Sequence, residues 1–113
     1  KKEKADLDIE LDDGINDLKY LNLLNENLTK ISNIIRPDIV FYISGVDILS
    51  TDKLGRLNIT RNGCKVRDEI VYEYAQKNNI PIVTSMGGGY SEKIYDIVEA
   101  HCNTFKTMSL ITD

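Results

Sequence analysis

The chain has 113 residues, 42% of them hydrophobic and 28% charged, which is typical of a globular protein and fits one small domain or a piece of a larger one. Its formal net charge of -4 argues against a general nucleic-acid surface, because binding to phosphates needs clustered Lys and Arg. The longest strongly apolar run, Ile39 to Ile43, is far too short to span a bilayer. We therefore expect no direct binding to nucleic acid and no membrane partner.

The two cysteines, Cys64 and Cys102, are far apart and lie in segments whose patterns indicate helices. Neither a zinc knuckle nor a disulfide framework is indicated by that spacing. Two free thiols fit a reducing compartment, so we expect an intracellular protein of the nucleus or cytoplasm.

The first elements are an edge strand, a turn and a long helix. Apolar and acidic residues alternate from Leu7 to Leu11, the period of a half-buried strand, and Asp13-Gly14 then predicts a turn. From Asn16 to about Ile35, apolar residues recur at steps of three and four, which predicts an amphipathic helix with one stripe facing a core. That stripe consists of Leu18, Leu21, Leu24, Leu28, Ile31 and Ile35.

The next segments alternate between strands and helices. The run Ile39 to Ile43 is apolar on both faces and rich in β-branched residues, which predicts a central parallel strand that stops at Gly45. Residues 45–59 show no period and are expected to form a functional loop. Thr60 is the expected cap of a second helix that reaches about Asn78.

The second helix is expected to bury Val66, Ile70 and Tyr74, with Val71 and Ala75 beside them. A short buried strand from Ile80 to Thr84 follows, and a third helix is expected to begin after Ser91. This order of strands and helices predicts an α/β fold, with an open parallel sheet and helices on its faces.

Two short segments carry the candidate chemistry, and each follows a predicted strand. Ser44-Gly45-Val46-Asp47 follows the first, and Met86-Gly87-Gly88-Gly89-Tyr90 follows the second. The carboxyl ends of parallel strands open onto one edge of a sheet, where ligand crevices form. A carboxylate and a phenol are therefore expected to meet there across one pocket.

Each candidate residue also has a simpler interpretation. Asp47 is suited to bind a metal, to act as a base or only to cap a turn. The three glycines fit either a sharp turn or a loop that binds an anion with its amides, although their spacing matches no phosphate-binding motif. The Tyr90 hydroxyl is suited to stabilise an oxyanion, or it lies in water at a helix start. The only histidine, His101, is expected to pack on a helix face.

Residues 37–60 resemble the corresponding block of the zinc-dependent histone deacetylases. In that family a strand delivers a Gly-x-Asp followed by Asp-x-Leu-Gly, and this chain has Gly45-Val46-Asp47 and Asp52-Lys53-Leu54-Gly55. The later Arg67-Asp68-Glu69 and the closing Gly-Gly-Tyr are similar to the class IV branch. On the residues alone, Asp52 and these three charged residues are expected to be loop and helix-surface charges. The resemblance covers residues 6 to 105, in which both motifs occur in the right order.

The resemblance implies a three-layer α/β/α fold with a mainly parallel sheet, in which residues 1–113 form the C-terminal part of an arginase-deacetylase domain. It implies that Asp47 is a zinc ligand and that Tyr90 polarises the acetyl carbonyl. Gly88 and Gly89 would line the channel for the acyl-lysine. The implied substrate is the acetylated lysine of a histone or another protein.

The family also needs an Asp-x-His pair of ligands and a tandem histidine that serves as general base, and the chain contains neither. Because a catalytic zinc needs about three protein ligands, we expect the chain alone to be inactive and to need the missing N-terminal part of the domain. Two alternatives stay open. One is a deacetylase of acetylated small amines, and the other is a non-catalytic α/β module that binds a ligand or anion.

Overall fold

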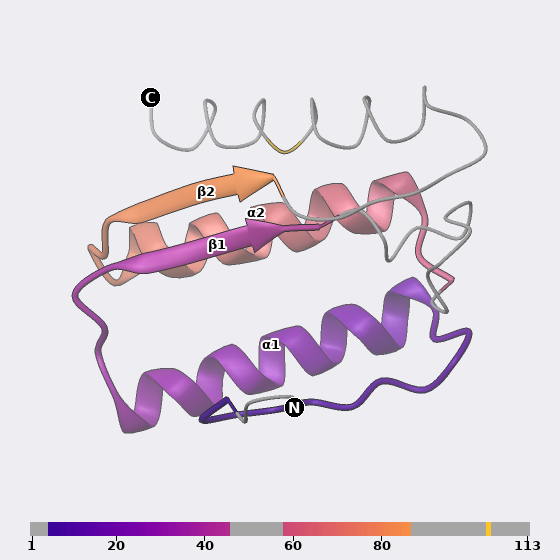
Figure 1. Ribbon diagram of the computed structural model, residues 1–113, viewed down its shortest axis with the longest axis horizontal. Coiled ribbons are helices and arrows are strands. Elements are labelled where there is room, and N and C mark those ends of the chain that lie inside the picture. The colour runs from indigo at the N-terminus through magenta and orange to yellow at the C-terminus, as the bar shows by residue number, and fades with distance from the viewer. Residues whose placement is uncertain (1–4, 46–57, 87–103, 105–113) are drawn as a thin grey trace.

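The structure is a computed structural model that describes residues 5–45, 58–86 and 104. Its elements in chain order are helix α1 (Asp17–Ile34), strand β1 (Val40–Ser44), helix α2 (Arg61–Lys77) and strand β2 (Ile82–Met86), as Figure 1 shows. His101, residues 46–57 of the predicted loop and the predicted third helix apart from Thr104 lie outside the described residues, and Thr104 itself is helical. From Asp17 to Met86 the predicted order of helix, strand, helix and strand is confirmed.

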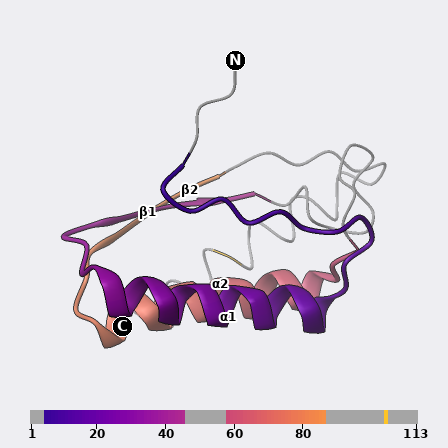
Figure 2. The ribbon, with the colours of Figure 1, turned by 90° about the horizontal axis from the view of Figure 1, so that it is seen from below.

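The two strands form a parallel sheet in which Val40 pairs with Ile82 and Ser44 pairs with Met86. Helix α2 is the crossover between them, and both helices lie on one side of the sheet (Figure 2). The predicted α/β fold is confirmed. Of the three layers expected, the described residues supply the sheet and one layer of helices.

Helix α1 begins where the sequence predicted. The Asn16 side chain caps it by accepting a hydrogen bond from the backbone N–H of Lys19 at 3.1 Å. Its apolar stripe is only partly covered, because no residue of α1 is fully buried and Leu18 and Ile35 are largely exposed. The middle of the predicted stripe, from Leu21 to Ile31, is half-buried, whereas its two ends are exposed.

Helix α2 also has the predicted N-terminal cap. The Thr60 hydroxyl accepts from the N–H of Gly63 at 3.0 Å, and at the other end Asn79 adopts a left-handed conformation with φ of 54°. The N–H groups of Asn79 and Ile80 then bond the carbonyls of Gln76 and Ala75, which is a Schellman motif. Because Ile80 completes this cap, β2 begins at Ile82, two residues later than predicted.

The two helices are joined at both ends. At their N-termini the Asp17 carboxylate accepts from the N–H of Thr60 at 2.9 Å and from its hydroxyl. At their C-termini, Arg36 donates to the carbonyl of Asn78 at 2.9 Å. A small core of Ile15, Ile59 and Cys64 lies near the first junction. The helices therefore run side by side in the same direction.

The predicted edge strand from Leu7 to Leu11 is absent, since these residues have no strand conformation. In Figure 1 the segment lies beside α1, away from β1 and β2, and Leu11 packs against the small core. Alternation of apolar and acidic residues shows only that an extended segment has two different faces. A strand also needs a neighbour for its backbone hydrogen bonds, and no described strand lies beside this segment. The predicted turn at Asp13-Gly14 is confirmed by a φ of 76° at Gly14.

Candidate functional site

The carboxyl ends of β1 and β2 are neighbours, as the candidate site requires. Ser44 and Met86 are the last paired residues, and the buried hydroxyl of Ser44 donates to the carbonyl of Ser85 at 3.1 Å. Asp47 follows Ser44 by three residues in sequence, and Gly88, Gly89 and Tyr90 follow Met86. These four predicted site residues lie outside the described residues, so their roles stay predictions.

Directly behind the end of β1 lies a buried arginine of α2. Arg67 is 5% exposed and donates to the carbonyl of Gly45, the residue that follows β1. Its Nε and Nη2 atoms donate to the Asp68 carboxylate at 3.0 and 2.9 Å. The guanidinium also lies 5.7 Å from the ring centre of Tyr42. Arg67 thus connects the helix to the backbone at the exit from the strand.

Asp68 is fully buried and accepts hydrogen bonds from three side chains. One carboxylate oxygen accepts from Arg67 and from the Tyr42 hydroxyl, and the other accepts from the hydroxyl of Thr104. A buried carboxylate is tolerated only when it is paired and hydrogen-bonded, and both conditions are met here. We call Arg67, Asp68, Tyr42 and Thr104 the buried polar network.

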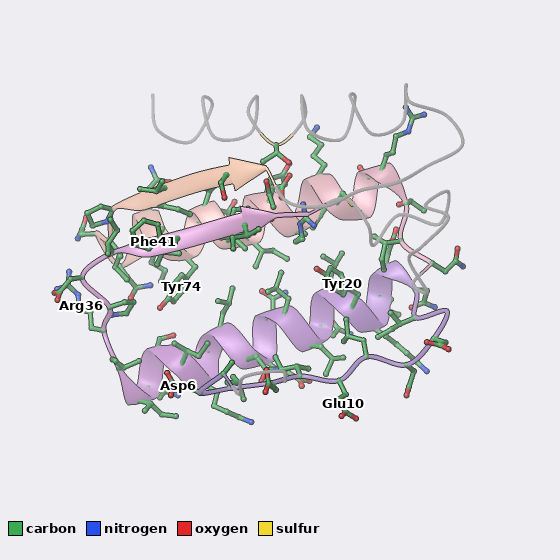
Figure 3. The ribbon with its side chains drawn as sticks, viewed as in Figure 1. Asp6, Glu10, Tyr20, Arg36, Phe41 and Tyr74 are labelled. Atoms are coloured by element: carbon green, nitrogen blue, oxygen red, sulfur yellow. The ribbon has the colours of Figure 1, made fainter. Side chains whose placement is uncertain are left out.

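The tyrosine of this network and two tyrosines beside it stay protonated. Burial raises the pKa of the Tyr42 phenol, and Asp68 raises it further, while Arg67 opposes the shift. Burial also raises the pKa of Tyr20, which reaches from α1 toward α2 (Figure 3) and interacts with Arg67. Tyr72 contacts Tyr42 edge-on, with ring centres 5.8 Å apart.

Arg67 itself stays charged. Burial lowers the pKa of its guanidinium, but the interactions with Tyr42 and Asp68 outweigh that effect and the net pKa is raised. The network therefore holds a permanent cation against the carbonyl of Gly45.

The prediction that Arg67 and Asp68 are helix-surface charges is wrong. The buried face of α2 includes Cys64, Arg67, Asp68, Val71, Tyr72 and Ala75, whereas the predicted Val66, Ile70 and Tyr74 are only half-buried. Helical periodicity could have predicted their burial, because residues 67 and 68 lie on the helical stripe that Cys64, Val71 and Ala75 define. Assigning Arg67 and Asp68 to the surface because they are charged overlooked that stripe.

The described residues contain no group of three or more His, Cys, Asp or Glu side chains that could hold a metal ion. No helix among the described ranges is long and apolar enough to cross a membrane. A groove of about 390 Å³ lies between the C-terminal halves of α1 and α2, where Tyr74 points into the space between them (Figure 3). This groove is at the opposite end of the sheet from the candidate site.

Parallel strands joined by a helical crossover, with candidate site residues after their carboxyl ends, define an α/β protein of the kind that binds ligands at that edge. The family model of the histone deacetylase domain matches residues 1–105. The chain therefore belongs to the histone deacetylase domain family.

Two curated relatives support the assignment. An uncharacterized protein of Picosynechococcus is 36% identical over 101 residues, which are 89% of this chain and 34% of that protein. Histone deacetylase 2 of Arabidopsis thaliana is 34% identical over 106 residues, which are 94% of this chain and 27% of the plant protein. The chain thus spans about a third or less of the length of these relatives.

Solved structures show the same fold. A histone deacetylase homologue from Aquifex aeolicus matches with a TM-score of 0.75 and 24% identity, over 94% of this chain and 26% of the homologue. A structure of a deacetylase homologue in complex with SAHA matches with the same TM-score, identity and coverage. The arginase-deacetylase fold expected from the sequence is confirmed.

Proposed function

We propose that the chain is the C-terminal portion of a zinc-dependent lysine deacetylase, here called the parent enzyme. The reaction is hydrolysis of the amide of acetyl-lysine in histones or other proteins, in which water adds to the carbonyl carbon and the C–N bond breaks. The observation that carries the proposal is the pairing of Ser44 with Met86. This pairing places the starting points of the Asp47 and Tyr90 segments side by side at the sheet edge where α/β proteins bind ligands.

The donor chemistry of Asp47 fits a zinc ion, because zinc accepts carboxylate oxygen as a ligand. Asp47 supplies one ligand, and the other ligands and the general base come from outside this chain. When bound, zinc supplies Lewis acidity to the reacting carbonyl and to a water molecule. Tyr90 donates its hydroxyl hydrogen bond to the carbonyl oxygen as negative charge develops there. Gly88 and Gly89 line the channel and leave room for the acyl-lysine chain.

The rest of the parent enzyme covers the open face of the sheet. Phe41 and Ile43 of β1 are 70% and 71% exposed, and Val83 of β2 is 47% exposed. These side chains alternate with Tyr42, which points to α2, so they share the opposite face. The matched homologue has about three quarters of its length outside the aligned part. We propose that the corresponding missing N-terminal part packs on this apolar face, and that the chain alone is inactive.

The test is metal analysis and turnover of the parent enzyme with two variants. Asp47→Ala is expected to lose bound zinc and activity together, because one of about three protein ligands is removed. Tyr90→Phe is expected to keep zinc while turnover falls about 10²–10³-fold, the usual effect of losing an oxyanion donor. His101→Gln is a suitable control, since His101 is expected only to pack.

Unchanged zinc content in Asp47→Ala would reject the proposal in favour of a non-catalytic module. Near-normal turnover in Tyr90→Phe would remove Tyr90 from the mechanism. Assays with an acetyl-lysine peptide and with acetylated small amines separate the two deacetylase alternatives. The proposal predicts a higher kcat/KM for the peptide.

A further inference from the structure

The starting point is the backbone at the exit from β1. The N–H of Gly45 bonds back to the carbonyl of Ile43 at 3.1 Å, so the chain turns sharply at this point. The carbonyl of Gly45 accepts from Nη1 of Arg67. Gly45 is thus held on both its N–H and its C=O, two residues before Asp47 in the sequence.

Arg67 is itself fixed on several sides. Its Nε and Nη2 atoms bond the Asp68 carboxylate, while Tyr42 lies beside its guanidinium group. Asp68 is in turn held by Tyr42 from β1 and by Thr104 from the C-terminal part of the chain. The planar guanidinium bonds a carboxylate on one side and a backbone carbonyl on another, which the single ammonium of a lysine cannot reproduce.

A buried ion pair is not explained by its contribution to stability, because apolar residues of similar volume often stabilise a core as well or better. The better-attested use of such a pair is to specify one geometry. Here the geometry specified is the path by which the chain leaves β1. Removal of the Arg67 contact would take away the hydrogen bond that holds the Gly45 carbonyl, two residues before Asp47 in the sequence.

We propose that Arg67 is a positioning residue that fixes the exit of β1 and thereby aims Asp47 at its metal ion, with Asp68, Tyr42 and Thr104 holding Arg67 in place. This inference rests on the proposed function, because Asp47 is a ligand only there. It assigns to Arg67 no contact with substrate or metal. Its effect acts through Gly45, which precedes Asp47 by two residues in the sequence.

The test uses the parent enzyme and the variant Arg67→Lys, which keeps the positive charge and loses the planar guanidinium. The measurements are zinc affinity by competition with a chelator, the visible absorption spectrum of the cobalt-substituted enzyme, and the free energy of unfolding. We expect zinc affinity to fall about 10- to 100-fold, as for other residues that orient a metal ligand. We also expect the cobalt spectrum to change, because the ligand geometry around the ion changes.

The matched control is Tyr72→Phe. Tyr72 is as buried as Arg67 and lies on the same helix, and its hydroxyl bonds Thr84 at 2.9 Å rather than Gly45. This variant is expected to lose some stability while its zinc affinity and cobalt spectrum stay as in the wild type. If Arg67→Lys loses stability but keeps both metal readouts, or if both variants weaken zinc binding equally, the positioning role is rejected.

If Arg67→Lys does not fold, the double variant Arg67→Gln/Asp68→Asn replaces it, because it leaves no unpaired buried charge. The same readouts decide, and an unchanged zinc affinity again overturns the inference. Failure of the proposed function gives a different result, since Asp47→Ala would then leave zinc content unchanged. If Asp47→Ala loses zinc while the Arg67 variant keeps its zinc affinity and cobalt spectrum, the positioning role is rejected and the proposed function stands.

Discussion

The two faces of the β1–β2 sheet differ in a way that runs against the usual expectation. The face covered by α2 carries Tyr42, Ser44 and Thr84, all of which make side-chain hydrogen bonds. The open face carries Phe41, Ile43 and Val83, which are largely exposed. In a soluble protein the apolar face of a sheet is normally the covered one.

The difference shows which face of the sheet has its contacts within this chain. Tyr42, Ser44 and Thr84 on the covered face each have a hydrogen-bond partner among the described residues. The open face has the composition of a core without the residues that would bury it, and exposed apolar patches of this kind mark interaction surfaces. The comparison therefore separates contacts made within the chain from an exposed apolar face on which, in our proposal, the rest of the domain packs.

The largest expected effect tests the open face. In the parent enzyme, Phe41→Ala should lower the free energy of unfolding by about 3–5 kcal/mol, the usual cost of removing a buried Phe side chain. Chemical denaturation measures this. The control is Ser85→Ala, because Ser85 pairs with Ile43 and is exposed on the same face. Its effect should be well below that of Phe41→Ala, because Ser85→Ala removes a single oxygen atom rather than an aromatic ring.

A change of less than about 1 kcal/mol in Phe41→Ala would contradict the comparison, because a surface residue has an effect of that size. The face would then be exposed in the parent enzyme as well. The missing part of the domain would have to pack elsewhere, for example on the exposed apolar residues of α1.

The next effect tests the covered face. Tyr42→Phe removes the donor to the Asp68 carboxylate and should lower the free energy of unfolding by about 1.5–3 kcal/mol, as for other hydrogen bonds to charged groups. Tyr74→Phe is the control, since Tyr74 lies on α2 but faces the groove between the helices. Thermal or chemical denaturation near pH 8 distinguishes the two variants.

The same tyrosine predicts a pH dependence. Its pKa is raised in the folded state, whereas an unfolded tyrosine loses its proton near pH 10. Above that pH the folded state binds more protons than the unfolded state, so stability falls as pH rises. The fall should be shallower in Tyr42→Phe than in the wild type between about pH 10 and 11. Equal slopes would show that Tyr42 is accessible to solvent.

Local signals in the sequence predicted most of the described fold. The Thr60 cap, the start of the first helix at Asn16 and the end of the second near Asn78 depend on neighbouring residues, so the sequence contains the whole interaction. The β-branched run of β1 likewise favours extended backbone through its own side chains. The edge strand at Leu7–Leu11 was wrong because pairing depends on a distant neighbour. The shift of β2 by two residues has a local cause that was missed, namely the use of Ile80 in the helix cap.

The candidate site was predictable only in its chain positions. Parallel pairing brings the carboxyl ends of β1 and β2 to one edge of the sheet, and the sequence indicated which residues come next. The register that pairs Ser44 with Met86 was not predicted. The buried polar network was not predicted, because Arg67, Asp68 and Tyr42 are brought together by tertiary packing between a strand and a helix. The charges of Arg67 and Asp68 favoured a position on the surface. Only their place on the helical stripe favoured burial.

The smallest expected effect tests the junction of the two helices that cover the sheet. Alanine is normally better than glycine inside a helix by about 0.5–1 kcal/mol. A Cβ at Gly63 would lie 2.3 Å from a carboxylate oxygen of Asp17 and 2.9 Å from Ile59. Gly63→Ala should therefore destabilise the parent enzyme, by about 1 kcal/mol if Asp17 gives up its bonds to the Thr60 cap.

A double-mutant cycle identifies the cause. In an Asp17→Ala background the nearest obstacle to the new methyl group is gone, and only the contact with Ile59 opposes the helical preference for alanine. Gly63→Ala should then be less destabilising than in the wild type, and chemical denaturation of the four proteins measures the difference. Equal effects in the two backgrounds would show that Asp17 does not approach Gly63. The bonds between Asp17 and Thr60 would then have to be tested separately, by comparing Asp17→Ala with the wild type.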